Sequence, residues 1–572
     1  MGNTTHSEKF SWISLLWLLI YFWYFSSLLQ LYVLVTGQSN SIGLRDSLLY
    51  SSLWLIPALL FPKKVKLIAG VIGIVLWLSS VVALAYFVVY GHQISQSVMF
   101  VMFVMFETNT NEAGEFLKQY FSFKVLGVIL AYTVVAIFLW TRLKPVTLPK
   151  PGRIGISLLI LVILFGIPYY NKGIKQDRPI ANVASYLNSK LAYAAPWQFV
   201  SGYLLYKNQL ANMEELIRDN SKIPPLENFV DANGDTPRTF VLVIGESTSR
   251  DRMSLYGYSR PTTPELDELA NDYPANLSVF NDVVTSRPYT IEALQQILTF
   301  ATQTEPELFN SRPSIMNMMK QAGFKTFWIT NQQTMTERNT LLTAFSRQTD
   351  KQYYLNNDMA QSSRIYDDVV FSPFKEALAD PAEKKFIVVH LLGTHMRYEF
   401  RYPEDKAIFK DKDSVVPANL NDDEVKDYNA YDNAQYYNDY VVSTLIKDFD
   451  SSKENGFLVF FSDHGEDVYD TPPHKMLGRS EGKPSKVIYN VPFLVWQSPE
   501  WLSTHQFDLN DKTARPFSNM DFIYAWSDLA GLNYTGFEPE KSLFNEAFKP
   551  QPRYIGDPDN KSSLMLYDDL KQ

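Results

Sequence analysis

Side chains that could bind a metal ion follow three separate apolar runs of this sequence. Glu246 follows the first run, Thr239–Ile244. His395 follows the second, Phe386–Leu392, and Asp463 with His464 follow the third, Phe457–Phe461. The chain has no cysteine, so carboxylates, imidazoles and hydroxyls are the ligands it offers. This mixture suits Zn²⁺ or Mn²⁺ and indicates a catalytic site with a coordination position open for substrate. We interpret Asp463 and His464 as metal ligands, and His390, inside the second run, as a buried structural histidine.

A threonine is the predicted nucleophile, because without cysteine that role falls to a hydroxyl or a carboxylate. Thr290 precedes a helical pattern over Ile291–Phe300. We predict that Thr290 is the N-cap of this helix, where backbone N–H groups and the helix dipole favour an anion such as a phosphate. Capping alone is the commoner role of such a threonine, and the nearby metal motifs are what favour the catalytic interpretation.

Five short runs rich in β-branched and aromatic residues predict the strands that must position these side chains. They are Thr239–Ile244, Thr326–Ile329, Phe386–Leu392, Phe457–Phe461 and Val491–Val495. Helical patterns separate the runs, so we predict buried parallel strands joined by crossover helices in an α/β domain. In such sheets the ligand site lies beyond the carboxyl ends of the strands, which is where the polar motifs fall.

The first third of the chain predicts membrane helices. Its apolar segments are residues 11–35, 46–61, 67–90, 125–141 and 154–169, near the length of about 20 residues that a spanning helix needs. We therefore predict a five-helix transmembrane domain over residues 1–170. A linker over 171–236 follows, with a membrane-surface segment at Trp197–Tyr206, and then a catalytic domain over 237–572.

Basic residues in two short loops predict the orientation of these helices. The residues are Lys63, Lys64 and Lys66 in one loop, and Arg142, Lys144, Lys150 and Arg153 in the other. Both loops are cytoplasmic if the N-terminus is cytoplasmic, and five crossings then place the catalytic domain outside. We expect a bacterial inner-membrane protein with a periplasmic catalytic domain. The net charge of -9 and the lack of a basic stripe argue against a nucleic-acid partner.

Several motifs together resemble the phosphoethanolamine transferases of the alkaline phosphatase and sulfatase superfamily. They are Gly245–Thr248, Leu255–Tyr258, Thr262–Pro264, His390 with Gly393–His395, Tyr431–Asn433 and Ser462–Glu466. The five predicted membrane helices are similar as well. Ser286–Thr290 and Asn331–Thr334 resemble the branch of this family that acts on the lipopolysaccharide core.

The resemblance implies a role for individual residues. It implies one metal ion held by Glu246, Thr290, Asp463 and His464. It implies that His395 and His474 contact the transferred phosphate or a second metal. The loop from Gly91 to Lys124 is external in the predicted orientation. There the resemblance implies a lipid headgroup site at Thr108 and Glu112, although a solvated surface helix fits that spacing equally well. Because the nucleophile segment differs in length from that of the relatives, Thr285 stays a second candidate nucleophile.

The function that the resemblance implies is transfer of phosphoethanolamine from phosphatidylethanolamine to lipopolysaccharide. We expect a core heptose as acceptor, a phosphothreonine-type intermediate on Thr290, and release of diacylglycerol. The alternatives are a lipid A phosphoethanolamine transferase and a transferase of phosphoglycerol-type groups on the same fold. A non-catalytic membrane scaffold is the alternative from another class of protein, and the intact set of candidate ligands argues against it.

Overall fold

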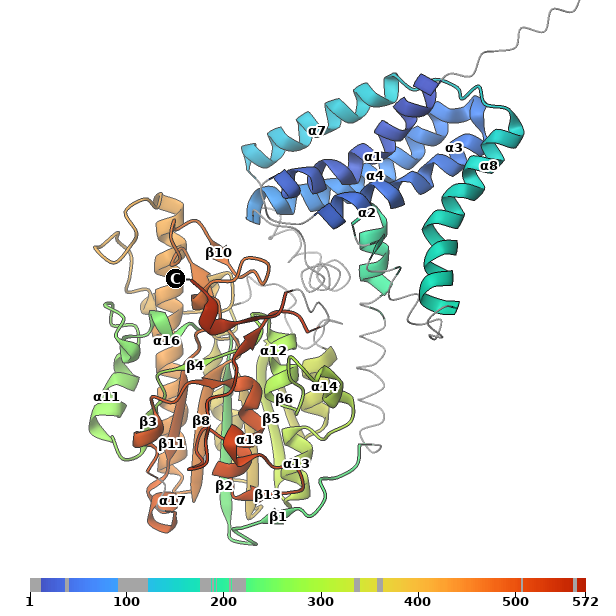
Figure 1. The fold of residues 1–572 in the computed structure, drawn as a ribbon. Coiled ribbons are helices and arrows are strands. Elements are labelled where there is room, and N and C mark those ends of the chain that lie inside the picture. The colour runs from blue at the N-terminus through green and yellow to red at the C-terminus, as the bar shows by residue number, and fades with distance from the viewer. Residues whose placement is uncertain are drawn as a thin grey trace, which may run out of the picture. The chain divides into compact units, whose positions relative to one another are not determined.

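Two compact units make up the chain, an N-terminal helical unit and a C-terminal α/β unit (Figure 1). The computed structural model describes residues 12–35, 41–90, 122–174, 187, 190–191, 193–204, 207, 223–333, 340–356, 364–505, 508–558 and 563–571. The lipid-site residues predicted at Thr108 and Glu112 lie outside the described residues.

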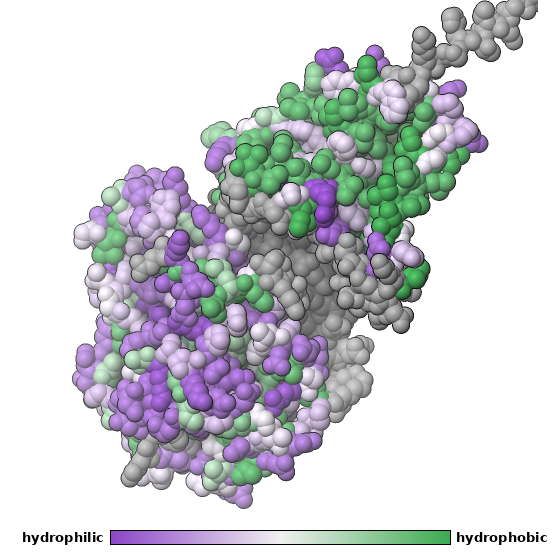
Figure 2. Space-filling view, in the orientation of Figure 1, coloured by the Kyte–Doolittle hydropathy of each residue, from purple (hydrophilic) through white to green (hydrophobic). Residues whose placement is uncertain are grey.

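The helical unit contains four helices that are long and apolar enough to cross a membrane, among the described residues. These candidate spans are Trp12–Val35, Pro62–Val89, Phe123–Thr141 and Lys150–Asn171. The helices are α1 (Trp12–Val35), α2 (Ser41–Ser51), α3 (Leu55–Leu60), α4 (Val65–Tyr90), α7 (Phe123–Thr141) and α8 (Lys150–Leu161), the last of which continues into π-helical turns. The surface of this unit is largely apolar (Figure 2), as lipid contact requires.

The second predicted membrane segment, residues 46–61, is an interrupted helix. A 3-10 turn at Ser52–Trp54 separates α2 from α3, and this segment is not among the four spans. The break follows a stretch rich in serine, whose hydroxyls bond to the backbone: the Ser52 hydroxyl donates to the Leu48 carbonyl at 2.8 Å. The number of membrane crossings therefore stays a prediction.

The two basic clusters lie at the same end of the helical unit, as the orientation argument requires. The Trp140 indole N–H donates to the Lys66 carbonyl oxygen at 2.9 Å. The Lys66 ammonium donates in turn to the carbonyl of Thr141 at 3.3 Å. The Arg153 guanidinium donates to the carbonyl of Leu59 at 2.9 Å. These bonds join the start of α4 to the end of α7, and the end of α3 to the start of α8.

Part of the predicted linker packs into the helical unit. The rings of Trp54 and Trp197 stack with centroids 5.4 Å apart. The backbone N–H of Ala195 donates to the Ser26 hydroxyl at 2.8 Å. Residues 193–204 thus belong to the helical unit rather than to a free connection.

The core of the α/β unit is a seven-stranded sheet in the order β3-β11-β8-β2-β7-β5-β6. The strands are β2 (Arg238–Gly245), β3 (Leu277–Val279), β5 (Lys325–Gln333), β6 (Lys351–Asn356), β7 (Lys384–His390), β8 (Gly456–Ser462) and β11 (Phe493–Gln497). The five strands from β8 to β6 are parallel. Four of the five predicted strands are among them, so the predicted α/β fold is confirmed.

The fifth predicted strand, Val491–Val495, was wrongly predicted to be parallel. It corresponds to β11, which pairs antiparallel with both β8 and β3. A parallel strand needs a crossover connection to bring the chain back to the starting edge of the sheet. Between β8 and β11 the chain forms no α-helix. The chain stays at the edge of the sheet where β8 ends. It therefore enters β11 from that edge and runs antiparallel to β8.

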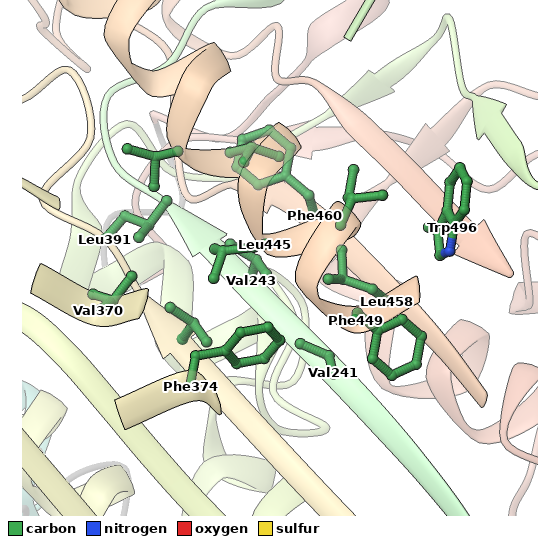
Figure 3. Close-up of a cluster of buried hydrophobic side chains, with 14 of the residues drawn as sticks. Val241, Val243, Val370, Phe374, Leu391, Leu445, Phe449, Leu458, Phe460 and Trp496 are labelled. Atoms are coloured by element: carbon green, nitrogen blue, oxygen red, sulfur yellow. The ribbon is translucent and has the colours of Figure 1, made fainter. Parts of the chain in front are cut away.

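Helices cover both faces of the sheet. On one face, α11 (Pro264–Asp272), α15 (Phe371–Leu378) and α16 (Asp422–Ser451) pack on Val241, Val243 and other alternate strand residues. Figure 3 shows Phe374 of α15 and Leu445 of α16 in this cluster. On the other face, Trp526 of α18 (Phe522–Leu529) contacts the rings of Phe240 and Phe457. Its indole also donates to the sulfur of Met319 in α13 (Ile315–Gln321). Burial of alternate residues on both faces fixes the register of the central strands.

The remaining elements are short. The helices are α12 (Thr290–Ile297), α14 (Thr340–Arg347) and α17 (Pro499–Thr504). The strand pairs are β1 (Val230–Asp231) with β13 (Leu532–Asn533), β9 (Asp467–Val468) with β10 (Leu477–Gly478), β4 (Val283–Val284) with β12 (Phe517–Ser518), and β14 (Tyr554–Ile555) with β15 (Met565–Leu566).

Candidate metal centre and active site

The strand register brings the first and third metal motifs together. Gly245 at the end of β2 pairs with Ser462 at the end of β8. The residues that follow, Glu246 and Asp463, therefore leave the sheet side by side. The Asp463 N–H also donates to the Gly245 carbonyl at 3.1 Å, which holds the two strand ends at the same level.

Three buried side chains form a cluster with the geometry of a metal site. One ligand atom each from Glu246, Asp463 and His464 lies within 4.8 Å of the others. The His464 Nε2 atom is 3.2 Å from Glu246 Oε1 and 3.4 Å from Asp463 Oδ2. The Thr290 hydroxyl completes the group. It donates to Glu246 Oε2 at 2.8 Å and lies 3.3 Å from His464 Nε2.

Surrounding hydrogen bonds leave the correct atoms free for a metal. His464 Nδ1 lies 2.9 Å from the Gly465 carbonyl, which can only accept, so this nitrogen carries the proton and Nε2 presents its lone pair. Asp463 Oδ1 accepts from the N–H groups of Ser247 and His464 at 3.1 and 2.7 Å. Asp463 Oδ2 is buried and accepts no hydrogen bond. Two carboxylates, an imidazole and a hydroxyl with such free atoms fit Zn²⁺.

The start of α12 differs by one residue from the prediction. Tyr289 is the N-cap, in an extended conformation, and Thr290 is the first helical residue. The predicted N-cap at Thr290 was therefore wrong. The physical reason is that its hydroxyl bonds to Glu246 and so is not available to cap the backbone. The hydroxyl nevertheless lies at the helix start, where the dipole favours negative charge.

Thr285, the second candidate nucleophile, has a different environment. Its hydroxyl donates to the carbonyl oxygen of Arg287 at 3.2 Å, and its N–H donates to the Tyr489 carbonyl at 2.9 Å. Both bonds fix the loop before α12. The geometry therefore favours Thr290 over Thr285 as nucleophile.

Burial and neighbouring charges shift the pKa values of Glu246 and Asp463 in opposite directions. Burial, together with the neighbouring Glu246 carboxylate, raises the pKa of the Asp463 carboxyl to about 8. For Glu246, burial raises the pKa, but His464, His395 and Arg479 together outweigh it and hold the pKa well below its usual range. Burial and Arg479 lower the pKa of His464, but Asp463 and Glu246 outweigh them and raise it. When no ion is bound, Asp463 therefore holds a proton at neutral pH.

Zinc binding is expected to release this proton. Below pH 8, Asp463 must lose its proton before Oδ2 can bind the ion, and His464, whose pKa is also raised, must lose the proton on Nε2. Apparent zinc affinity should therefore rise with pH by about ten-fold or more per unit. It should level off above the raised pKa of Asp463. Titration calorimetry of the chelator-treated full-length protein, in buffers of different ionisation enthalpy, measures the proton count. Zinc affinity that does not change between roughly pH 6 and 8 would contradict the expectation.

Arg479 is a residue of the site that the sequence did not indicate. Its guanidinium donates to the Ser247 hydroxyl at 3.1 Å and also to Glu466. Its charge lowers the pKa of Glu246. Arg479 directly follows β10, which is antiparallel to β9. Only the folding of this hairpin over the sheet brings it to the cluster, and the sequence carries no spacing signal for that.

The Tyr431–Asn433 motif has a positioning role. The Tyr431 hydroxyl donates to the Ser247 carbonyl at 2.7 Å and accepts from the Ser249 N–H at 2.9 Å. The neighbouring Asp432 accepts from Arg252 and Arg260 at 2.9 and 2.7 Å. These buried bonds fasten the loop after β2 to helix α16. They fix the backbone that carries Glu246.

The other predicted histidines lie in different surroundings. His395 contributes to lowering the pKa of Glu246, and its Nδ1 bonds to the Met396 carbonyl at 2.7 Å. His474 bonds through Nδ1 to the Tyr469 carbonyl at 2.7 Å. Among the described residues no hydrogen bond or ion pair joins His474 to the metal cluster, so its catalytic role stays a prediction. His390 is fully buried, and burial lowers its pKa to about 4, as a structural histidine requires.

Gly393 lets the loop after β7 approach Glu246. It has a φ of +55°, and an added Cβ would lie 2.6 Å from the Glu246 carbonyl oxygen and 2.8 Å from its nitrogen. Asp367 holds this loop in place, because it accepts the N–H groups of Leu392 and Gly393 at 2.9 and 2.7 Å. Any side chain at position 393 must displace the backbone of a metal ligand.

Gly393→Ala is therefore expected to lower transferase activity by roughly 100-fold, because a 1 Å displacement at an active site has an effect of that order. Gly234→Ala is the matched control, since Gly234 has a φ of +56° and open space around its Cβ position. Because alanine is strained in the left-handed backbone conformation, this variant should lose about 1 kcal/mol of folding stability. It should keep its transferase activity. Equal activity losses in both variants would show that backbone conformation, not the approach to Glu246, is what matters.

Comparison with known proteins agrees with this site. The sulfatase family model matches residues 238–532. The phosphoethanolamine transferase EptC of Escherichia coli O18:K1:H7 (strain RS218 / NMEC) is 56% identical over 561 residues, covering 98% of this chain and 96% of that protein.

Two solved structures are similar. The C-terminal periplasmic domain of EcEptC from Escherichia coli, in complex with Zn, matches with a TM-score of 0.60 and 59% identity, covering 61% of this chain and 97% of that domain. The integral membrane protein lipooligosaccharide phosphoethanolamine transferase A (EptA) from Neisseria meningitidis matches with a TM-score of 0.61 and 17% identity, covering 92% and 98%. At 17% identity the second match shows the fold alone. Identity of 56% over nearly the full length of both proteins means that this chain belongs to the phosphoethanolamine transferases of the sulfatase family.

Proposed function

We propose that the chain moves phosphoethanolamine from phosphatidylethanolamine to lipopolysaccharide, with a core heptose as acceptor, at the periplasmic side of a bacterial inner membrane. The observation that carries this proposal is the Thr290 hydroxyl, 2.8 Å from Glu246 and 3.3 Å from His464. A hydroxyl in such a position can act as a nucleophile and as a fourth metal ligand. Double displacement through it predicts ping-pong kinetics.

In the first step the Thr290 oxygen attacks phosphorus and the bond from phosphorus to the diacylglycerol oxygen breaks. Zinc, held by Glu246, Thr290, Asp463 and His464, would lower the pKa of the hydroxyl and balance the charge on the phosphoryl oxygens. The Thr290 hydroxyl donates to Glu246 Oε2, but the low pKa of Glu246 means that this carboxylate does not retain the proton, which passes to water. Diacylglycerol leaves with a proton, for which His395 is the proposed donor. Because its Nδ1 donates to the Met396 carbonyl, Nε2 is the atom that exchanges the proton.

The second step reverses the first with a new alcohol. An acceptor hydroxyl loses its proton to His395 and attacks the phosphorus bound to Thr290, and the threonine hydroxyl forms again. We keep His474 as a second candidate for contact with the phosphate. We keep Thr108 and Glu112 as the proposed contacts of the donor headgroup.

Mass spectrometry of lipopolysaccharide tests the donor group and the acceptor together. Cells that lack the gene are compared with cells complemented by the wild-type gene or by Thr290→Ala. We expect the mass of one phosphoethanolamine on the core only with the wild-type gene. The same added mass on lipid A would show that lipid A is the acceptor. An added mass of phosphoglycerol would show that phosphoglycerol is the group transferred. Equal spectra in all three strains would reject the proposed function.

A further inference from the structure

The helical unit contains a cavity of about 490 Å³ between α1, α4 and α7. Its volume lies in the range of about 300–1,000 Å³ that is typical of ligand pockets. The walls are mostly apolar and include Leu28, Ala83, Phe87 and Val128. The three helices run side by side in Figure 1. The volume and the apolar lining of the cavity fit a hydrocarbon chain.

One cation stands among the residues that line this cavity. Of the described lining residues, Lys124 alone is charged, and it is exposed at the second position of α7. Gln30 and Gln198 also line the cavity, and Gln30 is buried within α1. An apolar cavity next to a lysine is complementary to an amphipathic molecule with a negative group beside its chain.

The depth of the cavity indicates which leaflet this molecule comes from. The basic clusters lie at the end of the unit where α4 begins and α7 ends. The cavity is lined by the opposite ends of both helices, residues 80–88 and 124–132. With the basic end in the cytoplasm, the cavity lies at the depth of the outer leaflet.

We propose that this cavity holds an acyl chain of the donor phosphatidylethanolamine, with the lipid phosphate facing Lys124. The inference rests on the proposed function, because it takes the donor to be a phospholipid. The cavity would hold the diacylglycerol part while the headgroup is removed. It would thereby determine which lipid chains the enzyme accepts.

A second cavity in the same unit supplies a matched control. It measures about 370 Å³, and Gly70, Trp77, Ala136 and Trp140 are among its lining residues, which places it toward the basic end. Ala83 lines the first cavity and Ala136 the second, and each has a relative exposure of 7%. Phenylalanine at either position fills one cavity with the same side chain at equal burial.

The experiment uses the full-length protein in phosphatidylcholine nanodiscs that contain phosphatidylethanolamine with a diazirine in one acyl chain. Photolabelling should map to residues of α1, α4 and α7 that line the first cavity. Ala83→Phe should reduce labelling and raise the KM for the lipid by roughly ten-fold, while Ala136→Phe changes neither. Lys124→Glu, at an exposed position that does not threaten folding, should also reduce labelling, whereas Lys124→Arg should keep it.

Labelling that is unchanged in Ala83→Phe and in Lys124→Glu would overturn the proposal, as would an equal loss in Ala136→Phe. The Thr290→Ala variant separates this result from the proposed function. We expect it to be labelled like the wild type although it transfers nothing. If the wild type is labelled in the cavity but never releases diacylglycerol, the proposed function fails and the lipid site stands. If Ala83→Phe transfers the headgroup with an unchanged KM, the lipid site fails and the function stands.

Discussion

Thr290→Ala is expected to lower transferase activity by at least about 10,000-fold, as loss of a nucleophile does in enzymes with a covalent intermediate. The substitution removes the hydroxyl that donates to Glu246 Oε2 and lies beside His464, together with one methyl group. Zinc content should stay close to that of the wild type, because Glu246, Asp463 and His464 are intact. Incubation with phosphatidylethanolamine labelled in the headgroup, followed by mass spectrometry of the protein, measures the covalent intermediate directly.

Thr285→Ala is the matched control for this variant. It removes a threonine hydroxyl from the same loop, but one that bonds to the Arg287 carbonyl. We expect the labelled intermediate to form on Thr290 in Thr285→Ala and to be absent in Thr290→Ala. The opposite pattern would assign the nucleophile to Thr285. Thr290→Ser keeps the hydroxyl and should retain measurable activity.

Asp463→Asn is the variant with the second largest expected effect. Asp463 Oδ1 accepts two backbone N–H groups, while Oδ2 has no hydrogen bond. Asparagine can keep both backbone bonds through its carbonyl oxygen, and its NH₂ group then occupies the place of Oδ2. Because an NH₂ group cannot bind a metal, zinc affinity should fall by more than about 100-fold, a larger loss than for outer-shell residues. Activity should fall with the zinc content.

Asp467→Asn gives the comparison for Asp463→Asn. Asp467 is also buried and follows Asp463 by only a few residues, but its oxygens accept from Asp470, Thr471 and Ser485. This variant should lose stability without losing the metal. Zinc per protein by atomic absorption, together with the melting temperature, distinguishes the two effects. A full complement of zinc in Asp463→Asn would remove Asp463 from the ligand set.

The central strands and the metal motifs were predictable because they depend on local pattern. Continuous apolar runs indicate strands buried on both faces, and parallel strands end at one edge. Glu246 and Asp463 therefore had to emerge at neighbouring places once β2 and β8 were paired. The pattern also indicated that Asp463 and His464 bind a metal, whereas the full ligand set with Glu246 and Thr290 came from the resemblance to a family. No periodicity distinguishes a metal-binding carboxylate from a structural one such as Asp467.

The remaining features depend on contacts between distant segments. The antiparallel direction of β11 follows from a connection without a helix, a negative feature that is easy to overlook. Arg479 reaches Ser247 across 232 positions of sequence. Tyr289 rather than Thr290 caps α12 because the threonine hydroxyl bonds to Glu246. In each case a tertiary interaction decides a local detail.

The connection between β8 and β11 has a consequence for how such enzymes diversify. Its two ends are fixed beside each other in the sheet, where Phe461 pairs with Phe493. A closed loop tolerates insertions well, because each doubling of its length costs only about 0.6 kcal/mol. Positions of this connection that bond neither to the cluster nor to the sheet can therefore gain residues during evolution while the sheet keeps its stability. The length of the connection and the stability of the sheet are thereby separated within one polypeptide.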